Sequence, residues 1–474
     1  MDNLKFLKEN YYLNSSISYF KSNFEKRIKF IKQKIFLFEE IASFINNCID
    51  STKNVFIFCA GNSLIAKNIN CKKIFIKEID DKYHINHNEK ITYLDENVEN
   101  KLSECDSIII SDIEHQSNPT SNLLNLSKII KDDTKIIIIS RNLIWMILIK
   151  FLKLFLNFSP KKNNFLPSSY LDNLYSSCNL EIIRKEKIIA LPIYIPYFTN
   201  FINRIFRLPI FNFFCLSTIT ILKKINQNLS SDKDLKVSFI IPCKNEENNI
   251  RTFENEIREN DQSYEYLFGD DNSSDQTSSE IDELSKKLNN NNIIKYTGPG
   301  ICKSENVYKG IEISNGDIIV IYDADLTVSF KDIKFSIDIL KKTNADFINC
   351  TRMIYPQKDG AMKFFNFLGN SFFASLFSLL FRKKITDTLC GTKIFYKKDW
   401  IKIKKDISKW GMKDLWGDFD LLIGAYKNNL KITEVPVTYY ERKAEETKMT
   451  SVISNAMRML LIVFSAYYKL RLMK

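Results

Sequence analysis

The chain has 474 residues, more than the roughly 250–300 that one hydrophobic core usually supports, so two or three domains are expected. Hydrophobic residues make up 45% and charged residues 26% of the chain, which excludes a wholly disordered protein. Lys and Arg number 68 against 56 Asp and Glu, and the net charge of +12 excludes an acidic solvating protein. That charge favours an anionic partner, such as nucleic acid, a membrane surface or a phosphorylated ligand.

Histidine and cysteine usage narrows the chemistry further. His84, His87 and His115 are the only histidines and lie in the first quarter of the chain, so chemistry in the remaining three quarters runs without a histidine base. The ten cysteines are scattered singly, without the close pairs that zinc sites use. The first ten residues have no apolar run behind their charges, so we expect no secretory signal and reduced cysteines in a cytoplasmic compartment.

The first half of the chain has the pattern of an α/β domain. Apolar side chains recur every three to four residues over 1–50 and predict an N-terminal helical segment. Over 51–225, short apolar runs alternate with polar stretches, as in a doubly wound Rossmann-like sheet whose strands are buried on both faces. The last two runs could pair as a hairpin-like edge. The seven runs are 55–58, 73–76, 91–94, 107–111, 135–140, 180–189 and 216–222.

A second α/β pattern follows a polar stretch. Residues 226–235 lack periodicity and predict a linker. A new succession of strands and helices begins at 236 and is expected to form a second domain over 236–450, so the whole chain is assigned to the α/β class. The last segment, 451–474, is predicted to be a basic amphipathic helix. The expected strands of the second domain are 236–242, 264–268, 293–297 and 317–322, and the expected helices between them are 248–260, 274–289 and 303–314.

Polar motifs follow three of these strands. Ligands of open α/β sheets bind outside the carboxyl ends of the strands, so the motifs are placed to meet one. In the last motif, Asp323 and Asp325 end an apolar strand, and two acids there are costly unless a cation pairs with them. Hard cations such as Mg²⁺ or Mn²⁺ take such oxygen ligands together with substrate phosphates. The residues of the three motifs are Pro242, Asn245, Glu246, Asp270, Asp271, Asp323 and Asp325.

In this order and spacing, the motifs resemble the family 2 glycosyltransferases, in particular the dolichol-phosphate mannose synthase-like branch. The resemblance covers about 237–450. It implies a GT-A fold and a metal-dependent, inverting transfer of a sugar from a nucleotide-diphosphate donor. It implies that Asp323 and Asp325 bind Mg²⁺ or Mn²⁺, with Asp325 the more direct ligand. Thr327 stands where that branch has a glutamine ligand.

The same resemblance implies a nucleotide-sugar site. Asp271 would contact the nucleotide base, and Glu246 would lie near the base and the ribose. The other residues that the resemblance places at this site are Pro242, Asn245, Asp270 and Asp323.

Later segments extend the resemblance to the acceptor side. Residues 386–394 resemble an acceptor-site motif containing Asp387, and Asp418 begins a segment that resembles an acidic helix of the family. A glycan hydroxyl acceptor would need Asp418 or Asp387 as a base, whereas a polyprenyl-phosphate acceptor is already an anion and needs none. Structural roles for both acids, as helix caps or arginine partners, are an equal alternative. The implied partners of the leaving diphosphate are Arg352 and Arg442.

The first domain resembles a class I S-adenosylmethionine-dependent methyltransferase, which occurs fused to family 2 glycosyltransferases in bacteria. Its glycine-rich loop is reduced to Gly61, while Glu78 or Asp80 stands where a ribose ligand is expected. A sheet that kept the fold and lost the cofactor is the favoured interpretation. The alternatives are a bifunctional enzyme that also methylates, and a docking module without catalysis.

Apolar segments suggest contact with a membrane. None reaches the roughly 20 apolar residues that span a bilayer. Residues 143–158 and 364–381 come close, and 452–474 combines apolar and basic side chains. We expect a peripheral protein on the inner face of the cytoplasmic membrane, acting in cell-envelope polysaccharide or glycolipid synthesis. Burial inside the protein is the competing interpretation. A nucleic-acid partner is least favoured, because no basic run with interleaved aromatics is present.

Overall fold

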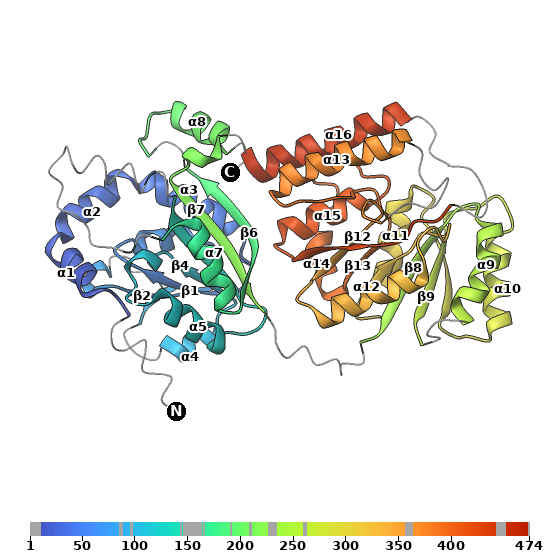
Figure 1. The fold of residues 1–474 in the computed structure, drawn as a ribbon, viewed down its shortest axis with the longest axis horizontal. Helices are drawn as coiled ribbons and strands as arrows, with labels where there is room; N and C mark the ends of the chain where they lie inside the picture. Colours follow the sequence, from blue (N-terminus) through green and yellow to red (C-terminus); the bar gives the residue numbers. More distant parts are fainter. Residues whose placement is uncertain are drawn as a thin grey trace. The chain divides into compact units, whose positions relative to one another are not determined.

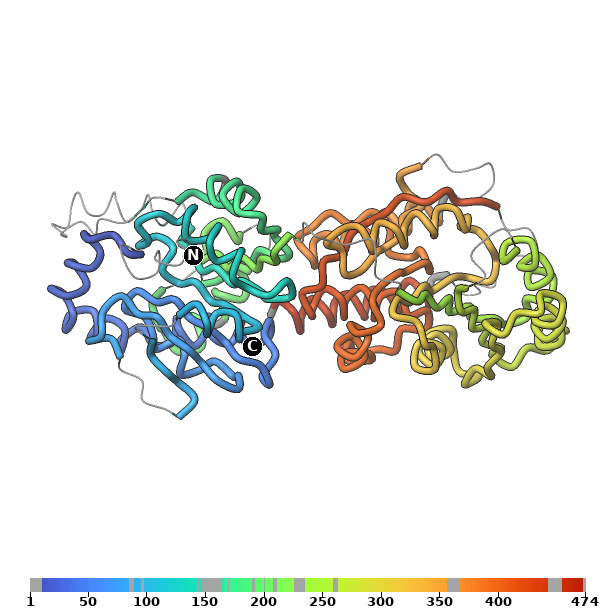
Figure 2. The backbone as a smooth tube through the Cα atoms, turned by 90° about the horizontal axis from the view of Figure 1, so that it is seen from below, coloured from blue at the N-terminus to red at the C-terminus, as the bar shows by residue number. Residues whose placement is uncertain are grey.

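A computed structural model of the chain shows two compact units, each with its own sheet (Figure 1). Unit 1 comprises Met1–Asn226 and Arg471–Lys474, and unit 2 comprises Gln227–Leu470. Figure 2 follows the backbone of each, blue to green in unit 1 and yellow-green to red in unit 2. The structure describes residues 11–84, 89–94, 98–142, 145, 164, 166–189, 192–207, 211–225, 235–258, 263–355, 364–441 and 452–472.

Unit 1 contains a seven-stranded sheet in the order β3-β2-β1-β4-β5-β7-β6. The first five strands of that order are parallel, and β7 is antiparallel to both β5 and β6. The predicted pairing of the last two runs is therefore confirmed. The strands are β1 (Asn54–Cys59), β2 (Lys73–Glu78), β3 (Ile91–Tyr93), β4 (Ser107–Ile110), β5 (Lys135–Arg141), β6 (Leu180–Ile188) and β7 (Ser217–Lys224).

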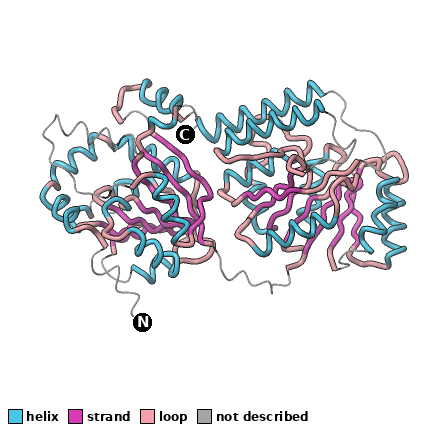
Figure 3. The backbone as a smooth tube through the Cα atoms, in the orientation of Figure 1, coloured by secondary structure: helices cyan, strands magenta, loops and turns pink. Residues whose placement is uncertain are grey.

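The central strands β1 and β4 are largely apolar, and helices cover both faces of the sheet (Figure 3). In β1, Phe56 and Phe58 belong to one hydrophobic cluster, whereas Val55 and Ile57 belong to another. Side chains alternate between the two faces of a strand, so a strand buried on both sides reads as a continuous apolar run.

Helices flank this sheet. The helical segment predicted over 1–50 is three helices, because the chain leaves helical geometry at Asn23 and Lys34. The described helices are α1 (Asn14–Ser22), α2 (Phe24–Gln33), α3 (Ile35–Asn46), α4 (Val98–Glu104), α5 (Pro119–Ile129), α7 (Ser168–Ser177) and α8 (Phe198–Phe206), with 3₁₀ turns at Ser63–Asn68, Asp81–Tyr83, Ile113–His115 and Asn212–Phe214.

Unit 2 also contains a seven-stranded mixed sheet, in the order β10-β9-β8-β11-β13-β12-β14. From β10 to β11 the neighbours are parallel, and β13 is antiparallel to β11 and β12. The strand order reverses between β8 and β11, which places a ligand crevice outside their carboxyl ends. The strands are β8 (Val237–Cys243), β9 (Glu265–Asp270), β10 (Ile293–Thr297), β11 (Ile318–Ile321), β12 (Phe347–Thr351), β13 (Lys393–Tyr396) and β14 (Ile432–Pro436).

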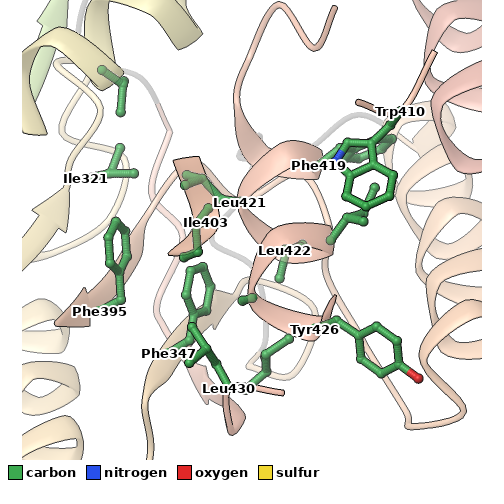
Figure 4. Packing of buried hydrophobic residues seen from close by; sticks show 14 of the residues in the cluster. Ile321, Phe347, Phe395, Ile403, Trp410, Phe419, Leu421, Leu422, Tyr426 and Leu430 are labelled. Atoms are coloured by element: carbon green, nitrogen blue, oxygen red, sulfur yellow. The ribbon is translucent and has the colours of Figure 1, made fainter. Parts of the chain in front are cut away.

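The helices of unit 2 position the carboxyl edge of this sheet. Helix α15 is buried along its length, and Phe419, Leu421 and Leu422 pack with Trp410 and Phe347 (Figure 4). Such packing fixes the first residue of α15 in place. The helices are α9 (Glu247–Arg258), α10 (Thr277–Leu288), α11 (Lys303–Ile313), α12 (Phe330–Lys342), α13 (Phe364–Phe381), α14 (Lys397–Lys404), α15 (Asp418–Lys427) and α16 (Val452–Tyr467).

Candidate active site

The loop after β11 presents the two acids of the Asp-Ala-Asp motif. Lys303, the first residue of α11, donates from Nζ to Asp323 Oδ1 at 2.5 Å. Asp325 Oδ1 accepts a 2.9 Å hydrogen bond from the hydroxyl of Thr327. Both carboxylates are partly exposed, and Leu326 beside them has a positive φ of 54° that closes the loop. The loop therefore holds two acids at the reversal point of the sheet.

The predicted acceptor-site motif lies against the first of these acids. A side chain at Gly391 would place its Cβ 2.3 Å from Asp323 Oδ2. Only glycine allows so close an approach. The segment 386–394 and the Asp-Ala-Asp loop therefore meet in one place.

Asp418 is the first residue of α15 and lies within reach of two lysines. Lys393 Nζ, which is fully buried, lies 3.7 Å from Asp418 Oδ1. Burial raises the pKa of Asp418 to about 6, although the charges of Lys393 and Lys303 act to lower it. Asp414 caps the same helix end, accepting from the amides of Phe419 at 2.8 Å and Asp420 at 3.0 Å. Asp418 itself is thus not the cap of its helix.

Asp387 is bound to Arg352 on both carboxylate oxygens. Arg352 Nε donates to Oδ2 at 2.8 Å and Nη2 donates to Oδ1 at 3.0 Å. Asn370 Nδ2 and the amide of Leu389 add hydrogen bonds to Oδ1 at 2.8 and 2.9 Å. Burial acts to raise the pKa of Asp387, but the Arg352 pairing outweighs it and holds the pKa well below its usual range. Arg352 also lies over the ring of Tyr439, 5.0 Å from its centroid.

The loops after β8 and β9 are tied to each other. The amide of Asn245 donates to Ser273 Oγ at 3.0 Å, and Asn245 Oδ1 accepts from the amide of Ser274 at 2.8 Å. The amide of Glu246 donates to Thr277 Oγ1 at 2.7 Å. Asn245 adopts a φ of 53°, which asparagine tolerates better than most residues.

Asp271 is buried beneath the loop that follows β10. Its Oδ1 accepts from the amide of Gly300 at 2.6 Å, and a Cβ at Gly298 would lie 2.5 Å from that oxygen. Asp270 Oδ1 accepts from the amide of Ser273 at 3.1 Å. Pro242 lies in β8, paired with a residue of β9. The predicted nucleotide-sugar residues therefore lie on adjacent loops at one edge of the sheet.

Residues 238–403 match the family described as glycosyl transferase family 2. Unit 2 contains a family 2 glycosyltransferase domain. The predicted resemblance to the family 2 glycosyltransferases is thereby confirmed for that stretch of the chain, whereas the dolichol-phosphate mannose synthase-like branch stays a prediction.

Solved structures similar to the chain include glucosyl-3-phosphoglycerate synthase from Mycobacterium tuberculosis. Its complex with Mn²⁺, UDP and glucosyl-3-phosphoglycerate shows 13% identity and a TM-score of 0.38, covering 50% of this chain and 80% of that chain. Its complex with Mg²⁺ and UDP shows 14% identity and a TM-score of 0.38, covering 49% of this chain and 79% of that chain.

Lys303 is the residue of this family 2 domain that sequence reasoning missed. The sequence feature that could have identified Lys303 is its position. It is the first residue of α11 and directly follows the loop containing Gly298 and Gly300. Burial acts to lower the pKa of Lys303, but the charges of Asp323, Asp418 and Asp325 outweigh it and raise the pKa above the usual value. Lys303 therefore links the Asp-Ala-Asp loop electrostatically to Asp418.

Other predicted residues pair with each other or lie outside the described part. Asp387, in the same segment as Gly391, pairs with Arg352. Arg442 and His87 lie outside the described residues. Within the described residues, no group of three or more His, Cys, Asp or Glu side chains is placed to hold a metal ion.

The residues predicted for the site of unit 1 are close together at the ends of β1 and β2. The amide of Gly61 donates to Glu78 Oε1 at 2.6 Å. Asp80 Oδ1 accepts from the amide of Lys82 at 3.1 Å, and Asp80 Oδ2 lies 3.7 Å from Lys21 Nζ. Asp80 thus caps the turn Asp81–Tyr83, whereas Glu78 faces the loop of Gly61.

Proposed function

We propose that the family 2 domain of unit 2 transfers a sugar, with inversion, from a nucleotide-diphosphate donor to an acceptor bound beside Asp418. The observation that supports this is the meeting of Asp323, Asp325, Lys303 and Asp418 at the carboxyl edge of β11. Acids and a lysine from three elements converge there, at the point where the strand order reverses.

The donor would lie along that edge. Asp271 and Glu246, on the loops after β9 and β8, would hold the nucleoside, and the diphosphate would reach the Asp-Ala-Asp loop. Lys303 supplies a positive charge there, which lowers the energy of the charge that builds on a leaving diphosphate. Preorganised charge of this kind acts without reorganising in the reaction.

The donor set at Asp323 and Asp325 fits Mg²⁺ or Mn²⁺. Two carboxylates beside a substrate diphosphate are the ligands that Mg²⁺ usually takes, and the two side chains are partly open to solvent. When bound, the ion would supply Lewis-acid neutralisation of the diphosphate oxygens. Lys303 meanwhile offsets part of the negative charge of Asp323, to which its ammonium group donates.

The role of Asp418 depends on whether the acceptor is a hydroxyl or a phosphate. A glycan hydroxyl would lose its proton to Asp418, whose pKa of about 6 leaves it mostly ionised at neutral pH and close to the working pH of a general base. A polyprenyl phosphate would need no base, and Asp418 would then position the acceptor. Asp387 is less suited to take a proton, because Arg352 already binds both of its oxygens.

We place Arg352 and Arg442 near the leaving diphosphate as the prediction from sequence did. The hydrogen bonds between Arg352 and Asp387 support a fixed guanidinium at the end of β12. The acceptor class and a role in cell-envelope polysaccharide or glycolipid synthesis belong to the same proposal.

The test is a turnover assay of the full chain. A panel of nucleotide sugars with Mn²⁺ or Mg²⁺ is offered with a polyprenyl phosphate or a glycan acceptor, and release of nucleoside diphosphate is measured. Asp325→Asn is expected to lower turnover by roughly 100-fold or more. Asp338→Asn, an exposed acid in α12, is the control and should change nothing. Unchanged turnover in Asp325→Asn overturns the proposal.

We further propose that the protein binds the cytoplasmic membrane from its inner face. Helices α13 and α16 lie side by side (Figure 1), and each buries one face in the core of unit 2. Their other faces expose Phe367, Leu368, Phe372 and Leu379 on α13, and Met457, Leu461 and Phe464 on α16. Apolar stripes beside basic residues suit an anionic lipid interface.

Unit 1 has a comparable surface on α8. Thr199 and Asn203 of that helix are buried, whereas Phe198 and Phe201 are 51% and 60% exposed. Thr199 Oγ1 donates to the carbonyl of Ile193 at 2.7 Å, which holds the polar face inward. The apolar face of α8 is consequently turned to the outside.

Among the described residues, no helix combines the length and the apolarity that crossing a bilayer requires. The proposal is tested by vesicle binding. Co-sedimentation with phosphatidylcholine vesicles, with and without phosphatidylglycerol, is the measurement. Phe372→Asp and Phe464→Asp are expected to reduce the bound fraction several-fold. Phe335→Asp, at a 55% exposed phenylalanine of α12, is the control. Equal sedimentation of all variants contradicts the membrane proposal.

A further inference from the structure

Unit 1 has a ligand crevice of its own by the same topological rule. Its strand order reverses between β1 and β4, so a ligand would lie outside their carboxyl ends. The loop after β1 contains Gly61, the loop after β4 contains Asp112, and Glu78 ends β2 beside them. A methyltransferase-like sheet would hold its cofactor among these residues.

The N-terminal part of the chain lies across this crevice. Tyr12 forms an antiparallel bridge with Gln116, just after β4. The amide of Leu13 donates to the carbonyl of His115 at 2.9 Å, and the amide of Ser117 donates to the carbonyl of Tyr11 at 2.9 Å. Residues 11–22, which we name the occupant segment, are thus fastened along the loop after β4.

Two tyrosines of the occupant segment reach the strand ends. The hydroxyl of Tyr12 donates to the carbonyl of Cys59, the last residue of β1, at 2.8 Å. The ring of Tyr11 stacks on Phe58 at 5.3 Å between centroids, and its hydroxyl accepts from Gln116 Nε2 at 2.7 Å. Both tyrosines are at least nine-tenths buried.

Phe20 packs against Gly61, in the space that the missing side chain of this glycine leaves. A Cβ at Gly61 would lie 2.6 Å from Phe20 Cε1 and 3.2 Å from Tyr83 Cε1. Phe20 has no exposed surface, and its carbonyl accepts from the hydroxyl of Tyr83 at 3.0 Å. The space that a glycine opens for a cofactor is filled by this phenyl ring.

The acids of the crevice are also turned to protein partners. Glu78 Oε1 accepts from the amides of Gly61 at 2.6 Å and Ile79 at 2.9 Å, and Asp112 Oδ1 accepts from Gln116 Nε2 at 3.0 Å. Burial raises the pKa of Glu78 to about 8, so this acid is mostly protonated at neutral pH. A ribose would find Glu78 buried and its Oε1 already engaged by the backbone.

Protein side chains stand where the cofactor would lie. Phe20, Tyr11 and Tyr12 are each at least nine-tenths buried at the ends of β1 and β4. The residues present therefore do not fit S-adenosylmethionine.

We infer that the occupant segment takes the place of the cofactor in unit 1, so that unit 1 folds and works without S-adenosylmethionine. The contacts of Tyr12 with Cys59 and of Phe20 with Gly61 support this assignment. It excludes the bifunctional enzyme and leaves a non-catalytic module. It does not depend on the sugar transfer proposed for unit 2.

Titration calorimetry of the full chain with S-adenosylmethionine is the first test. No saturable heat is expected up to millimolar cofactor, and saturable binding overturns the inference. Hydrogen exchange on the same protein is the second. The amides of Leu13, Gly61 and Ser117 are expected to exchange at least 100-fold slower than in an unstructured peptide, and exchange at the peptide rate overturns it.

A double-mutant cycle tests the central contact. Phe20→Ala and Gly61→Ala are each expected to lower the urea midpoint of the full chain. In the double variant the two losses should be less than additive, because the alanine at 61 no longer meets the ring. Full additivity shows that Phe20 does not occupy the loop in solution and overturns the inference. Sugar-transfer activity is not a readout in any of these tests.

Discussion

Lys303 donates a 2.5 Å hydrogen bond to Asp323, so the first acid of the Asp-Ala-Asp motif has a fixed cation of its own. The two residues come from different parts of the fold, the start of α11 and the loop after β11. Two positive charges would then act on one donor diphosphate, the lysine of the protein and the proposed metal ion. The contribution of the lysine can be measured separately from that of the metal ion by mutation.

Lys303→Met is expected to lower kcat/KM for the nucleotide sugar by roughly 100-fold, because a preorganised positive charge beside the leaving group is lost. Lys303→Arg should retain part of the activity. Lys309→Met removes an exposed lysine of α11 that donates to the carbonyl of Thr297, the last residue of β10, and serves as the control. Wild-type kinetics in Lys303→Met would show that Lys303 has no part in the reaction.

The pH dependence of transfer depends on the acceptor. With a hydroxyl acceptor, Asp418 must be ionised, so kcat/KM should fall as the pH drops below about 6. Lys393→Met removes a cation that favours the ionised form, and the acidic limb should then move to higher pH. With a phosphate acceptor no limb from Asp418 is expected.

Asp418→Asn is the control for that profile. It should abolish transfer to a hydroxyl and spare transfer to a phosphate. A hydroxyl-transfer profile that keeps its acidic limb in Asp418→Asn contradicts the assignment of Asp418 as the base.

The Arg352–Asp387 pair is predicted to stabilise the folded protein. Arg352→Met leaves a buried carboxylate without its cation, which is expected to cost about 3–5 kcal/mol. Arg352→Met combined with Asp387→Asn should recover much of that loss, because the unpaired charge is removed as well. Thermal unfolding measures both variants. A single variant with an unchanged Tm but no turnover would assign Arg352 directly to catalysis.

Gly391 and Gly369 form a matched pair of glycine substitutions. Gly391→Ala is expected to reduce turnover sharply, because its Cβ would lie 2.3 Å from Asp323 Oδ2. Gly369 lies in helix α13 with nothing within 4 Å of its Cβ position, so Gly369→Ala should keep activity. It should also raise stability by about 1 kcal/mol, the difference in helix propensity. Equal activities of the two variants would contradict the packing at Asp323.

Local patterns explain why much of the fold and part of the site could be predicted. Apolar runs identify strands such as β11, and the acids that follow, Asp323 and Asp325, lie at the strand end by chain connectivity alone. The partners of those acids are not local. Lys303 is 20 residues from Asp323, and Arg352 is 35 residues from Asp387. Only tertiary packing brings them together.

The same limit applies to unit 1. The amphipathic pattern of the first 50 residues predicted a helical segment, and α1 to α3 confirm that much. Nothing in that pattern distinguishes an apolar face packed on a helix from Phe20 packed on a glycine loop. The reduced glycine content of the loop, with only Gly61 left, was the available signal that the cofactor site had changed.

Glu78 should make the stability of unit 1 fall with rising pH. Its pKa is about 8 in the folded protein because burial disfavours the charge, against roughly 4.3 in an unfolded chain. Between those values the folded state binds more protons than the unfolded state, so the free energy of unfolding decreases as the pH rises through that window and levels off above about 8. Glu78→Gln keeps an acceptor for the amides of Gly61 and Ile79 without the titration. The drop in urea midpoint between pH 5 and pH 8.5 should therefore be smaller in Glu78→Gln than in the wild type. Glu99→Gln, at a partly exposed acid of α4, is the control and should follow the wild type. Identical pH profiles for all three proteins would place Glu78 in contact with solvent, outside the crevice that the occupant segment fills.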